Sequence, residues 1–210
     1  MINPLWKRIL EISYKHKTSH VGSCLSCVDI IDRIYETKKP DDIFLLSCAH
    51  ANLAWLVVLE KYFGYNADEL FSNQGVHATK DPKIGILCSG GHLGQVFACS
   101  VGFALANPKK TVHVLISDGE WYSGIIQEGL NFIWEKNLIN LIPHCNFNGY
   151  SALGETNTTM LSRITKSYVP WAEIHYPSYY SFKIPFLKGL QGHYHVLTDE
   201  DWKYLNEKVF

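Results

Sequence analysis

The sequence has no excess of charge of either sign, and this absence excludes several classes of protein. Its 19 lysines and arginines nearly balance its 20 aspartates and glutamates, so the formal net charge is −1. Proteins that bind nucleic acids or other polyanions usually carry a basic excess that is clustered on one face or in one tail. We therefore expect no nucleic-acid partner.

Long hydrophobic runs are also missing. The most apolar stretch, AWLVVL at residues 54–59, is far too short to cross a bilayer. The opening residues, MINPLWKRILEISYKHK, lack the apolar core of a signal peptide. We expect a cytoplasmic protein without a membrane partner.

The six cysteines do not form the framework of a small secreted fold. They are spread through apolar or helical surroundings at positions 24, 27, 48, 88, 99 and 145, so we expect reduced thiols. Cys24 and Cys27 form a C-x-x-C pair, which is compatible with a redox pair or with half of a zinc site. No second pair follows, and small packed residues are the favoured interpretation.

The hydrophobic residues that are present, 47% of 210, are enough for one substantial domain over residues 1–210. Their pattern predicts helices from residue 4, at 26–35, 50–63, 93–106 and 123–136 and after Thr198, and strands at 41–47, 112–116, 137–143, 172–176 and 180–186. Strand, helix and strand in this order imply a right-handed crossover. We therefore expect an α/β fold with a doubly wound, mostly parallel sheet and helices on both faces.

Polar residues follow two of the predicted strands and indicate a ligand site. Asp118 and Gly119 come after one strand, and Asn146, Asn148 and Gly149 come after the other. The carboxyl ends of parallel strands face one crevice, and carboxylate and amide oxygens suit a hard cation such as Mg²⁺ or Ca²⁺. An acidic turn with an unrelated asparagine turn remains the alternative on these residues alone.

Several motifs resemble those of a known family. Asp-Gly-Glu at 118–120, a helix, a strand and Asn-Gly at 148–149 resemble the signature with which enzymes bind thiamine diphosphate. Four further segments resemble the N-terminal, diphosphate-binding half of the transketolases: SHVGSCLSCVDII, DDIFLLSCAHANLAWLVVLEKYFGY, GGHLGQVFACSVGFALA and GLQGHYHVLTDEDWKYL. They occur in the same order as in the family and cover most of the chain. The resemblance implies one diphosphate-binding domain of the thiamine-diphosphate type.

The resemblance also implies the site residues. Asp118, Asn148 and the main-chain carbonyl of Tyr150 would hold Mg²⁺ or Ca²⁺, and the metal would bridge the diphosphate. Thiamine diphosphate would be bound by residues around the metal and the glycine loop, namely His50, Gly91, His92, Leu93, Gly119, Glu120 and Asn148. The catalytic residues would be four histidines that contact cofactor or sugar and transfer protons: His20, His50, His77 and His193.

The histidines have alternative interpretations. Taken singly, His20 or His50 can simply cap a helix, and His77 lies in a polar loop. His92 stands where the family normally has serine or proline, so it contacts phosphate, changes specificity or lies at the surface. The remaining histidines are expected to be structural or to face solvent: His16, His113, His144, His175 and His195. A shift of the alignment by two residues would put His195 in the place of His193.

The chain departs from the family pattern at several positions. Ser117 replaces the first glycine of Gly-Asp-Gly, and Ser123 stands where the family has a glutamate that couples two active sites. Val21 and Val96 replace a proline and a glycine. The region between Tyr168 and Lys188 is shorter than in the family, so we expect the domain to be shortened near its C-terminal end.

The resemblance implies a partner, because the glutamate that activates the cofactor comes from a pyrimidine-binding domain that no part of this chain resembles. We expect a C-terminal transketolase-like subunit, an α2β2 heterotetramer and a sugar or sugar-phosphate substrate. The expected activity is that of a transferase of carbohydrate metabolism, which moves a two-carbon ketol unit from a ketose to an aldehyde. The alternatives are a carboligase on an unusual acceptor such as a nucleotide-linked keto sugar, a non-catalytic relic subunit, and a metal-dependent phosphate-binding module without thiamine.

Overall fold

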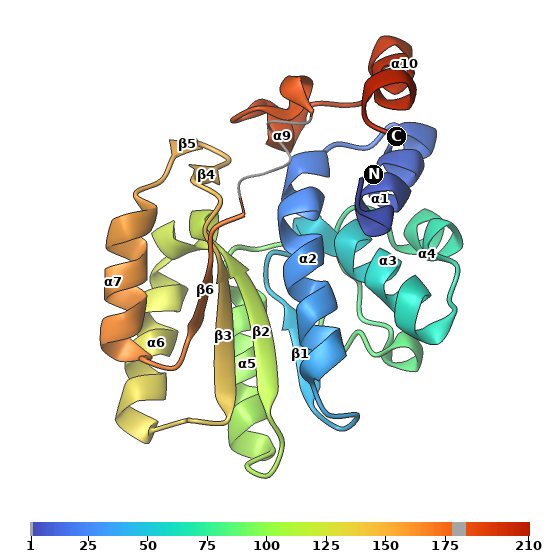
Figure 1. The fold of residues 1–210 in the computed structure, drawn as a ribbon. Coiled ribbons are helices and arrows are strands. Elements are labelled where there is room, and N and C mark those ends of the chain that lie inside the picture. Colours follow the sequence, from blue (N-terminus) through green and yellow to red (C-terminus); the bar gives the residue numbers. More distant parts are fainter. Residues whose placement is uncertain (1, 178–183) are drawn as a thin grey trace.

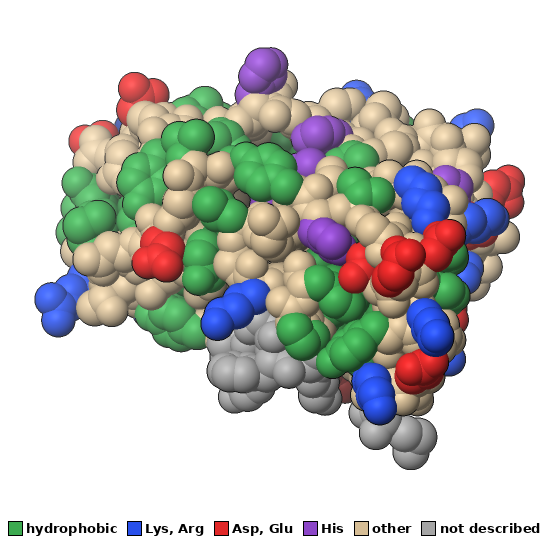
Figure 2. Space-filling model, turned by 90° about the horizontal axis from the view of Figure 1, so that it is seen from above, with side chains coloured by type: hydrophobic (Ala, Val, Ile, Leu, Met, Phe, Trp, Pro, Cys, Tyr) green, Lys and Arg blue, Asp and Glu red, His purple; other side chains and the backbone are tan. Residues whose placement is uncertain are grey.

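A parallel sheet forms the centre of the computed structural model, which describes residues 2–177 and 184–210. Four strands of this sheet lie within the described residues: β1 (Ile43–Leu46), β2 (Val112–Ser117), β3 (Leu141–Asn146) and β6 (Glu173–His175). They lie in the order β1-β2-β3-β6, and each neighbouring pair is parallel. All four carboxyl ends therefore meet at one edge, which is the upper edge in Figure 1 and faces the viewer in Figure 2.

Helices cover both faces of the sheet, as predicted (Figure 1). The first half of the chain supplies one layer, consisting of α1 (Pro4–His16), α2 (Val21–Thr37), α3 (Asn52–Phe63) and α4 (Ala67–Gln74). The other layer consists of α5 (Gln95–Ala106), α6 (Gly124–Lys136) and α7 (Thr158–Tyr168). Each layer has its own cluster of buried apolar side chains against the sheet. The expected fold class is confirmed.

Local sequence signals set the ends of several helices. The Asn3 side chain accepts a hydrogen bond from the backbone N–H of Leu5 at 2.9 Å and caps α1, with Pro4 at the first helical position. Gly64 ends α3 with φ of 73°, a conformation that costs glycine little. Thr198 opens α10 (Asp199–Lys208) through the predicted capping box with Asp201.

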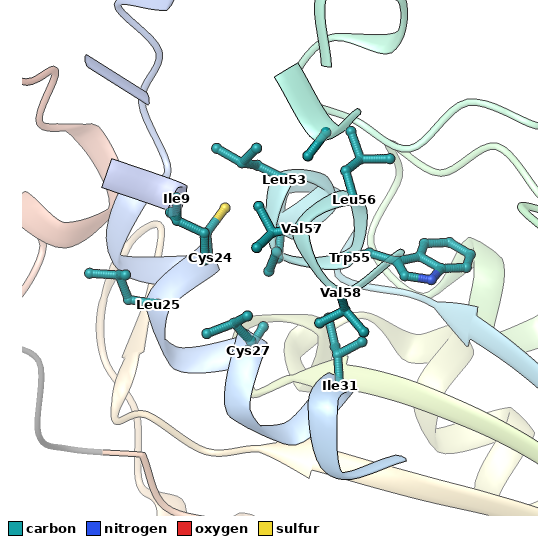
Figure 3. Close-up of a cluster of buried hydrophobic side chains, with 14 of the residues drawn as sticks. Ile9, Cys24, Leu25, Cys27, Ile31, Leu53, Trp55, Leu56, Val57 and Val58 are labelled. Atoms are coloured by element: carbon teal, nitrogen blue, oxygen red, sulfur yellow. The ribbon is translucent and has the colours of Figure 1, made fainter. Parts of the chain in front are cut away.

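The helices α2 and α3 pack against each other through small and branched side chains (Figure 3). The labelled residues of α2, such as Cys24 and Ile31, point toward those of α3, such as Leu53 and Val58, and all four are at most 3% exposed. Side chains buried this completely each contribute about 1.5–3 kcal/mol when they leave water. This packing fixes the start of α2, which lies at the carboxyl edge of the sheet.

Short elements complete the carboxyl edge. They are η1 (Ala49–Ala51), η2 (Pro82–Ile84), η3 (Asp118–Tyr122), β4 (Tyr150–Ser151), β5 (Gly154–Glu155), η4 (Pro185–Leu187) and α9 (Gln191–Tyr194). β4 and β5 pair as a small antiparallel hairpin. The Tyr194 hydroxyl donates to the carbonyl of Ala152 at 2.7 Å and ties α9 to the turn of that hairpin.

The structure corrects two predicted strands and contains elements that were not predicted. The strand expected at 137–143 begins only at Leu141 and runs to Asn146, because 137–140 form the turn after α6. The strand expected at 180–186 falls partly on residues 180–183, which lie outside the described residues, and its end belongs to the short helix η4. The helices α4 and α7 and the β4–β5 hairpin were not predicted. The strand expected at 172–176 is confirmed as β6.

Two further expectations concern membranes and thiols. In the part of the chain that the structure describes, every helix is too short or too polar to cross a membrane. All six cysteines are free, and Cys24 and Cys27 are both buried. The C-x-x-C pair therefore consists of two small packed residues at the start of α2.

Candidate functional site

A cavity of about 460 Å³ lies at the carboxyl edge of the sheet. Its walls come from the segments that follow β1, β2 and β3, from the first turns of α2, from the loop between α4 and α5, and from α9. Most of the predicted site residues line it: His20, His50, His77, Gly91, Leu93, Asp118, Gly119, Asn148, Tyr150 and His193. Figure 2 shows histidine side chains across the middle of this face, with hydrophobic side chains gathered to one side and charged ones to the other.

Asp118 forms one wall of the cavity, where β2 ends and η3 begins. One carboxylate oxygen accepts from the backbone N–H of Gly149 at 2.8 Å and from the Thr156 hydroxyl at 2.9 Å. The other oxygen accepts from the N–H of Gly119 at 3.1 Å. These bonds join the segment after β2 to the segment after β3, so Asp118 and Asn148 lie on adjacent loops as the sequence predicted.

Asp118 is buried, and the groups that donate to its carboxylate carry no positive charge. Its three hydrogen-bond donors are neutral, and removal from water raises the pKa of the carboxyl group from 3.8 to about 6 although each donor lowers it. A carboxylate in such a place gains energy from any cation that reaches it. Asp118 therefore has the electrostatics of a metal ligand.

Asparagine and main-chain oxygens surround the same point. Asn148 Oδ1 accepts from the N–H of Tyr150 at 3.0 Å and keeps a second lone pair. Asn146 Nδ2 donates to Ser26 Oγ at 2.9 Å and to Cys27 Sγ at 3.0 Å. Its Oδ1 is buried in the cavity wall and has no hydrogen-bond partner among the described residues. A buried acceptor of this kind lacks a donor or a cation, so the oxygen set fits Mg²⁺ or Ca²⁺ and a bound diphosphate.

Four histidines form another wall of the cavity. Their ring centroids lie 4.4 Å apart for His20 and His193, 5.4 Å for His20 and His50, 6.2 Å for His20 and His77, and 5.5 Å for His50 and His193. They come from four segments of the chain: the start of α2, η1, the loop after α4, and α9. The structure brings together all four histidines that the resemblance singled out.

Backbone bonds position these histidines. His20 has φ of 67° at the start of α2, and its N–H donates to the carbonyl of His193 at 2.9 Å. A non-glycine residue in this left-handed region carries strain that the surrounding contacts must hold. The N–H of Ala78 donates to the carbonyl of Ala49 at 3.1 Å, which brings His77 beside His50.

Burial, helped by mutual repulsion, keeps three histidines of the cluster uncharged. Removal from water, helped by the neighbouring histidines, lowers the pKa of His50 from 6.5 to about 3 and that of His20 to about 4. Burial also lowers the pKa of His193. At neutral pH these rings each carry one donor nitrogen and one acceptor nitrogen, which is the state that hydrogen bonds to hydroxyl and carbonyl oxygens require.

Two residues of the predicted cofactor set lie away from the cavity. His92 is exposed and does not line it. Glu120 is completely buried, and its carboxylate accepts hydrogen bonds from Ser47 Oγ, from the N–H of Gly94 at 3.1 Å and from the N–H of Ser117 at 2.8 Å. It braces the loops behind the cavity and does not line the cavity itself.

Sequence reasoning missed three residues of the site and did not assign a role to a fourth. Ser26 and Cys27 hold the amide of Asn146, and Thr156 holds the carboxylate of Asp118. Asn146 itself was placed at the crevice but not among the metal ligands. The alternating strand pattern could have found Asn146, since it puts residues 144 and 146 on the same face of β3. Nothing in the local sequence marks the other three.

Comparisons with known proteins identify relatives of this chain. No model of a known protein family matches it. The chain is 29% identical over 168 residues to 1-deoxy-D-xylulose-5-phosphate synthase of Fusobacterium nucleatum and covers 27% of that protein with 78% of its own length. It is 29% identical over 175 residues to one subunit of the apulose-4-phosphate transketolase of Phocaeicola vulgatus, with coverage of 73% of this chain and 62% of the relative. A third relative, one subunit of the 6-deoxy-6-sulfo-D-fructose transketolase of a Clostridium species, is 28% identical over 174 residues, with coverage of 73% and 63%.

Solved structures share the fold. A transketolase from Leishmania mexicana superposes with a TM-score of 0.61 at 23% identity, over 82% of this chain and 31% of that one. A transketolase from Pichia stipitis gives 0.53 at 20% identity, over 72% and 31%. The chain thus spans less than two thirds of the length of the curated relatives that it matches.

Proposed function

This chain is related to the transketolases, and we propose that it is the diphosphate-binding subunit of a two-subunit, thiamine-diphosphate-dependent enzyme. The enzyme transfers a two-carbon ketol unit from a ketose to an aldehyde acceptor. Residues 1–210 act as one diphosphate-binding domain, and a second chain supplies the pyrimidine-binding domain. The names of two relatives, each a transketolase subunit, support this division of labour.

The observation that carries the proposal is the pairing of two walls in one cavity. One wall offers the oxygens of Asp118, Asn148 and the Tyr150 carbonyl, and the other offers four histidines, of which His20 and His50 are uncharged at neutral pH. A hard cation and a diphosphate need the first wall, while hydroxyl and carbonyl oxygens of a sugar need the second. Both kinds of group are required when a metal-bound cofactor and a ketose react with each other.

The oxygen wall would hold the metal and the diphosphate. Asp118, Asn148 and the Tyr150 carbonyl bind Mg²⁺ or Ca²⁺, and Gly91, Leu93 and Gly119 line the space for the phosphates. A Cβ at Gly91 would meet no atom within 4 Å, so the backbone there is open to a ligand. Thiamine diphosphate, when bound, supplies the carbon nucleophile and the electron sink that carbon–carbon bond cleavage in a ketose needs.

The histidine wall would hold the sugar and move its protons. Nδ1 of His20 already contacts Ser19 Oγ at 2.8 Å, which leaves Nε2 for the substrate. His50 and His193 lie beside it, so a proton that leaves one sugar oxygen has another acceptor within reach. General acid–base catalysis of this kind contributes about 10²–10⁴-fold.

The rim of the cavity offers a surface for the partner chain. Leu93, Tyr122 and Leu153 line the cavity and are 54%, 61% and 95% exposed. Large apolar side chains beside a polar site are typical of a protein interface. In the proposed assembly, two copies of each chain enclose the cofactor between them.

Calorimetric titration tests the proposal. Thiamine diphosphate with Mg²⁺ is titrated into this chain alone and into its mixture with the C-terminal transketolase-like chain of the same organism. Asp118→Ala removes the central metal ligand, and Asp41→Ala, an exposed aspartate, is the matched control. We expect tight binding in the mixture, a loss of at least about 100-fold in Asp118→Ala and no change in Asp41→Ala.

Two outcomes would overturn the proposal. If the two chains associate but bind no cofactor, the chain is a non-catalytic partner subunit. If inorganic diphosphate with Mg²⁺ binds as tightly as thiamine diphosphate, the site is a phosphate-binding module without thiamine. A screen of ketose donors with sugar-phosphate and nucleotide-linked acceptors then separates the transketolase from the carboligase.

A further inference from the structure

A row of three histidines crosses the sheet outside the cavity. His113 lies on β2, His144 on β3 and His175 on β6, and all three side chains point to the face that α2 covers. The strand register pairs His144 with Glu173 and Asn146 with His175. His113 and His144 are buried, and none of these four ionisable side chains lines the cavity.

Three donor atoms, from His144, His175 and Glu173, converge on one point beside this row. His144 Nδ1 lies 3.4 Å from His175 Nε2 and 3.5 Å from Glu173 Oε2, and the last two atoms are 3.8 Å apart. Two atoms that bind one tetrahedral zinc ion at about 2.0–2.1 Å lie about 3.4 Å from each other. The triangle thus has nearly the size that a tetrahedral metal ion requires. Within residues 2–177 and 184–210, no other group of three or more histidine, cysteine or acidic side chains converges in this way.

One hydrogen bond and one nearby carboxylate behind the triangle leave the correct nitrogen free. The Asp42 carboxylate lies 4.0 Å from His113 Nε2 and favours the proton on that nitrogen. His113 Nδ1 is then an acceptor, and it lies 3.0 Å from His144 Nε2. His144 must donate through Nε2, which leaves the lone pair of Nδ1 directed at Glu173 and His175. Metal-bound histidines are typically oriented by such a relay to a carboxylate.

The charge and exposure of the site suit an ion that enters from solvent. Two neutral imidazoles and one carboxylate carry a net charge of −1. The Glu173 side chain is 49% exposed and that of His175 is 16% exposed, so one side of the triangle is open. The positive charge of Arg33, on α2, lies close enough to influence both Glu173 and His175. Imidazole ligands favour zinc and similar transition metals over Mg²⁺.

We propose that His144, Glu173 and His175 bind a zinc-type transition metal ion at the edge of the sheet, with a water molecule as the fourth ligand. His113 and Asp42 are positioning residues that orient His144. The ion joins β3 to β6, a strand of only three residues. A metal that binds the folded chain alone also stabilises it by mass action.

Metal titration of the untagged, chelator-treated chain tests this site. Co²⁺ is the spectroscopic probe, since tetrahedral Co²⁺ absorbs visible light far more strongly than octahedral Co²⁺, and Zn²⁺ is then titrated in competition. All titrations are repeated in a His20→Gln, His77→Gln background, which weakens any binding by the histidines of the cavity. We expect one equivalent of tetrahedral Co²⁺, displaced by one equivalent of Zn²⁺, in both backgrounds.

The variants separate ligands from positioning residues. Glu173→Gln changes a half-exposed side chain and should fold normally, yet it should weaken Zn²⁺ binding at least about 100-fold, whereas His113→Gln should weaken it about 10–100-fold. His16→Gln, at a half-buried histidine that pairs with Asp68, is the matched control and should have no effect. Equal Zn²⁺ affinity in the wild type and Glu173→Gln, or no tetrahedral Co²⁺ spectrum in the folded wild type, would overturn the proposal.

Discussion

Glu120 makes the densest set of hydrogen bonds of any single side chain behind the cavity. Its two oxygens accept from Ser47, Gly94 and Ser117, and burial raises its pKa while those donors lower it. Ser47 Oγ in turn accepts from the N–H of Phe97 at 3.1 Å, near the start of α5. One carboxylate therefore joins the segments that follow β1, precede α5 and end β2.

We predict that Glu120→Gln destabilises the chain by about 2 kcal/mol or more. Glutamine keeps one acceptor oxygen and places an amide group, itself a donor, against a buried N–H or hydroxyl. Urea unfolding of the cofactor-free chain measures the change, with Glu36→Gln on the exposed face of α2 as the control. A variant as stable as the wild type would show that Glu120 does not support the loops.

At the scale of residues, the sequence shows which side chains belong to the site more reliably than it shows what surrounds each side chain. The family motifs singled out His20, His77 and Asp118, and the structure gathers them around one cavity. Their roles as proton carriers and metal ligand stay predictions. The position of Glu120 could not be predicted, because a carboxylate next to a ligand loop looks the same in sequence whether it faces the ligand or the core.

At the scale of elements, the contact between α2 and α9 sets the geometry of the histidine wall. A Cβ at Gly22 would lie 2.7 Å from the Cα of Gly192 and 2.7 Å from its carbonyl oxygen. Both are backbone atoms, so they cannot turn aside as a side chain would. This close approach lets His20 and His193 meet.

We predict that Gly22→Ala lowers the free energy of unfolding by about 1–3 kcal/mol and displaces His193 from His20. The transferase activity should therefore fall even at temperatures where the variant stays folded. Gly102→Ala in α5 is the matched control, because a Cβ there meets nothing within 4 Å. Alanine in an exposed helix interior should stabilise the chain by about 0.5–1 kcal/mol. Thermal unfolding and the transferase assay of the assembled enzyme measure both changes, and a Gly22→Ala enzyme of full activity would contradict the prediction.

Sequence signals predicted elements well where caps and apolar stripes agree. The helix α1 has both, and it was placed correctly. The helix α7 was missed because five of its eleven residues are serine or threonine, which have low helix propensity, although Asn157 caps it and Leu161 and Thr165 are buried. The late start of β3 reflects pairing with β2, which no local pattern of residues 137–140 reveals.

At the scale of the whole molecule, buried histidines make stability depend on pH. His20, His50, His113 and His175 all have pKa values of about 3 to 4 in the folded chain, against 6.5 when exposed. Between pH 6.5 and about 4, the unfolded chain therefore binds protons that the folded chain cannot. The free energy of unfolding falls as the pH falls through this window. Above the window these histidines add no pH dependence.

We predict that Tm falls by several degrees between pH 7 and pH 5, since each kcal/mol lowers the Tm of a chain of this size by about 2–4 °C. His20→Gln combined with His50→Gln should flatten the profile, and His92→Gln, at an exposed position, should leave it unchanged. Differential scanning fluorimetry over this pH range measures the slopes. Parallel profiles for the double variant and the wild type would count against the assignment.

The row of His113, His144 and His175 shows why the whole molecule holds more than its sequence reveals. These residues were expected to be structural or to face solvent, and in the sequence they are about thirty residues apart. They meet only because three parallel strands pair in one register. Registry between strands is a tertiary property, and a single sequence carries little information about it.

The two residues joined by the hydrogen bond between His20 and His193 are synthesised at very different times. A ribosome adds about 5–20 residues per second, so about 10 seconds or more pass between the synthesis of these two residues. A nascent chain can already contain Asp118 and Asn148 while it still lacks α9. Asp118 and Asn148 are therefore synthesised before the histidine wall can form, and a chain interrupted in this interval would contain the proposed metal ligands without His193.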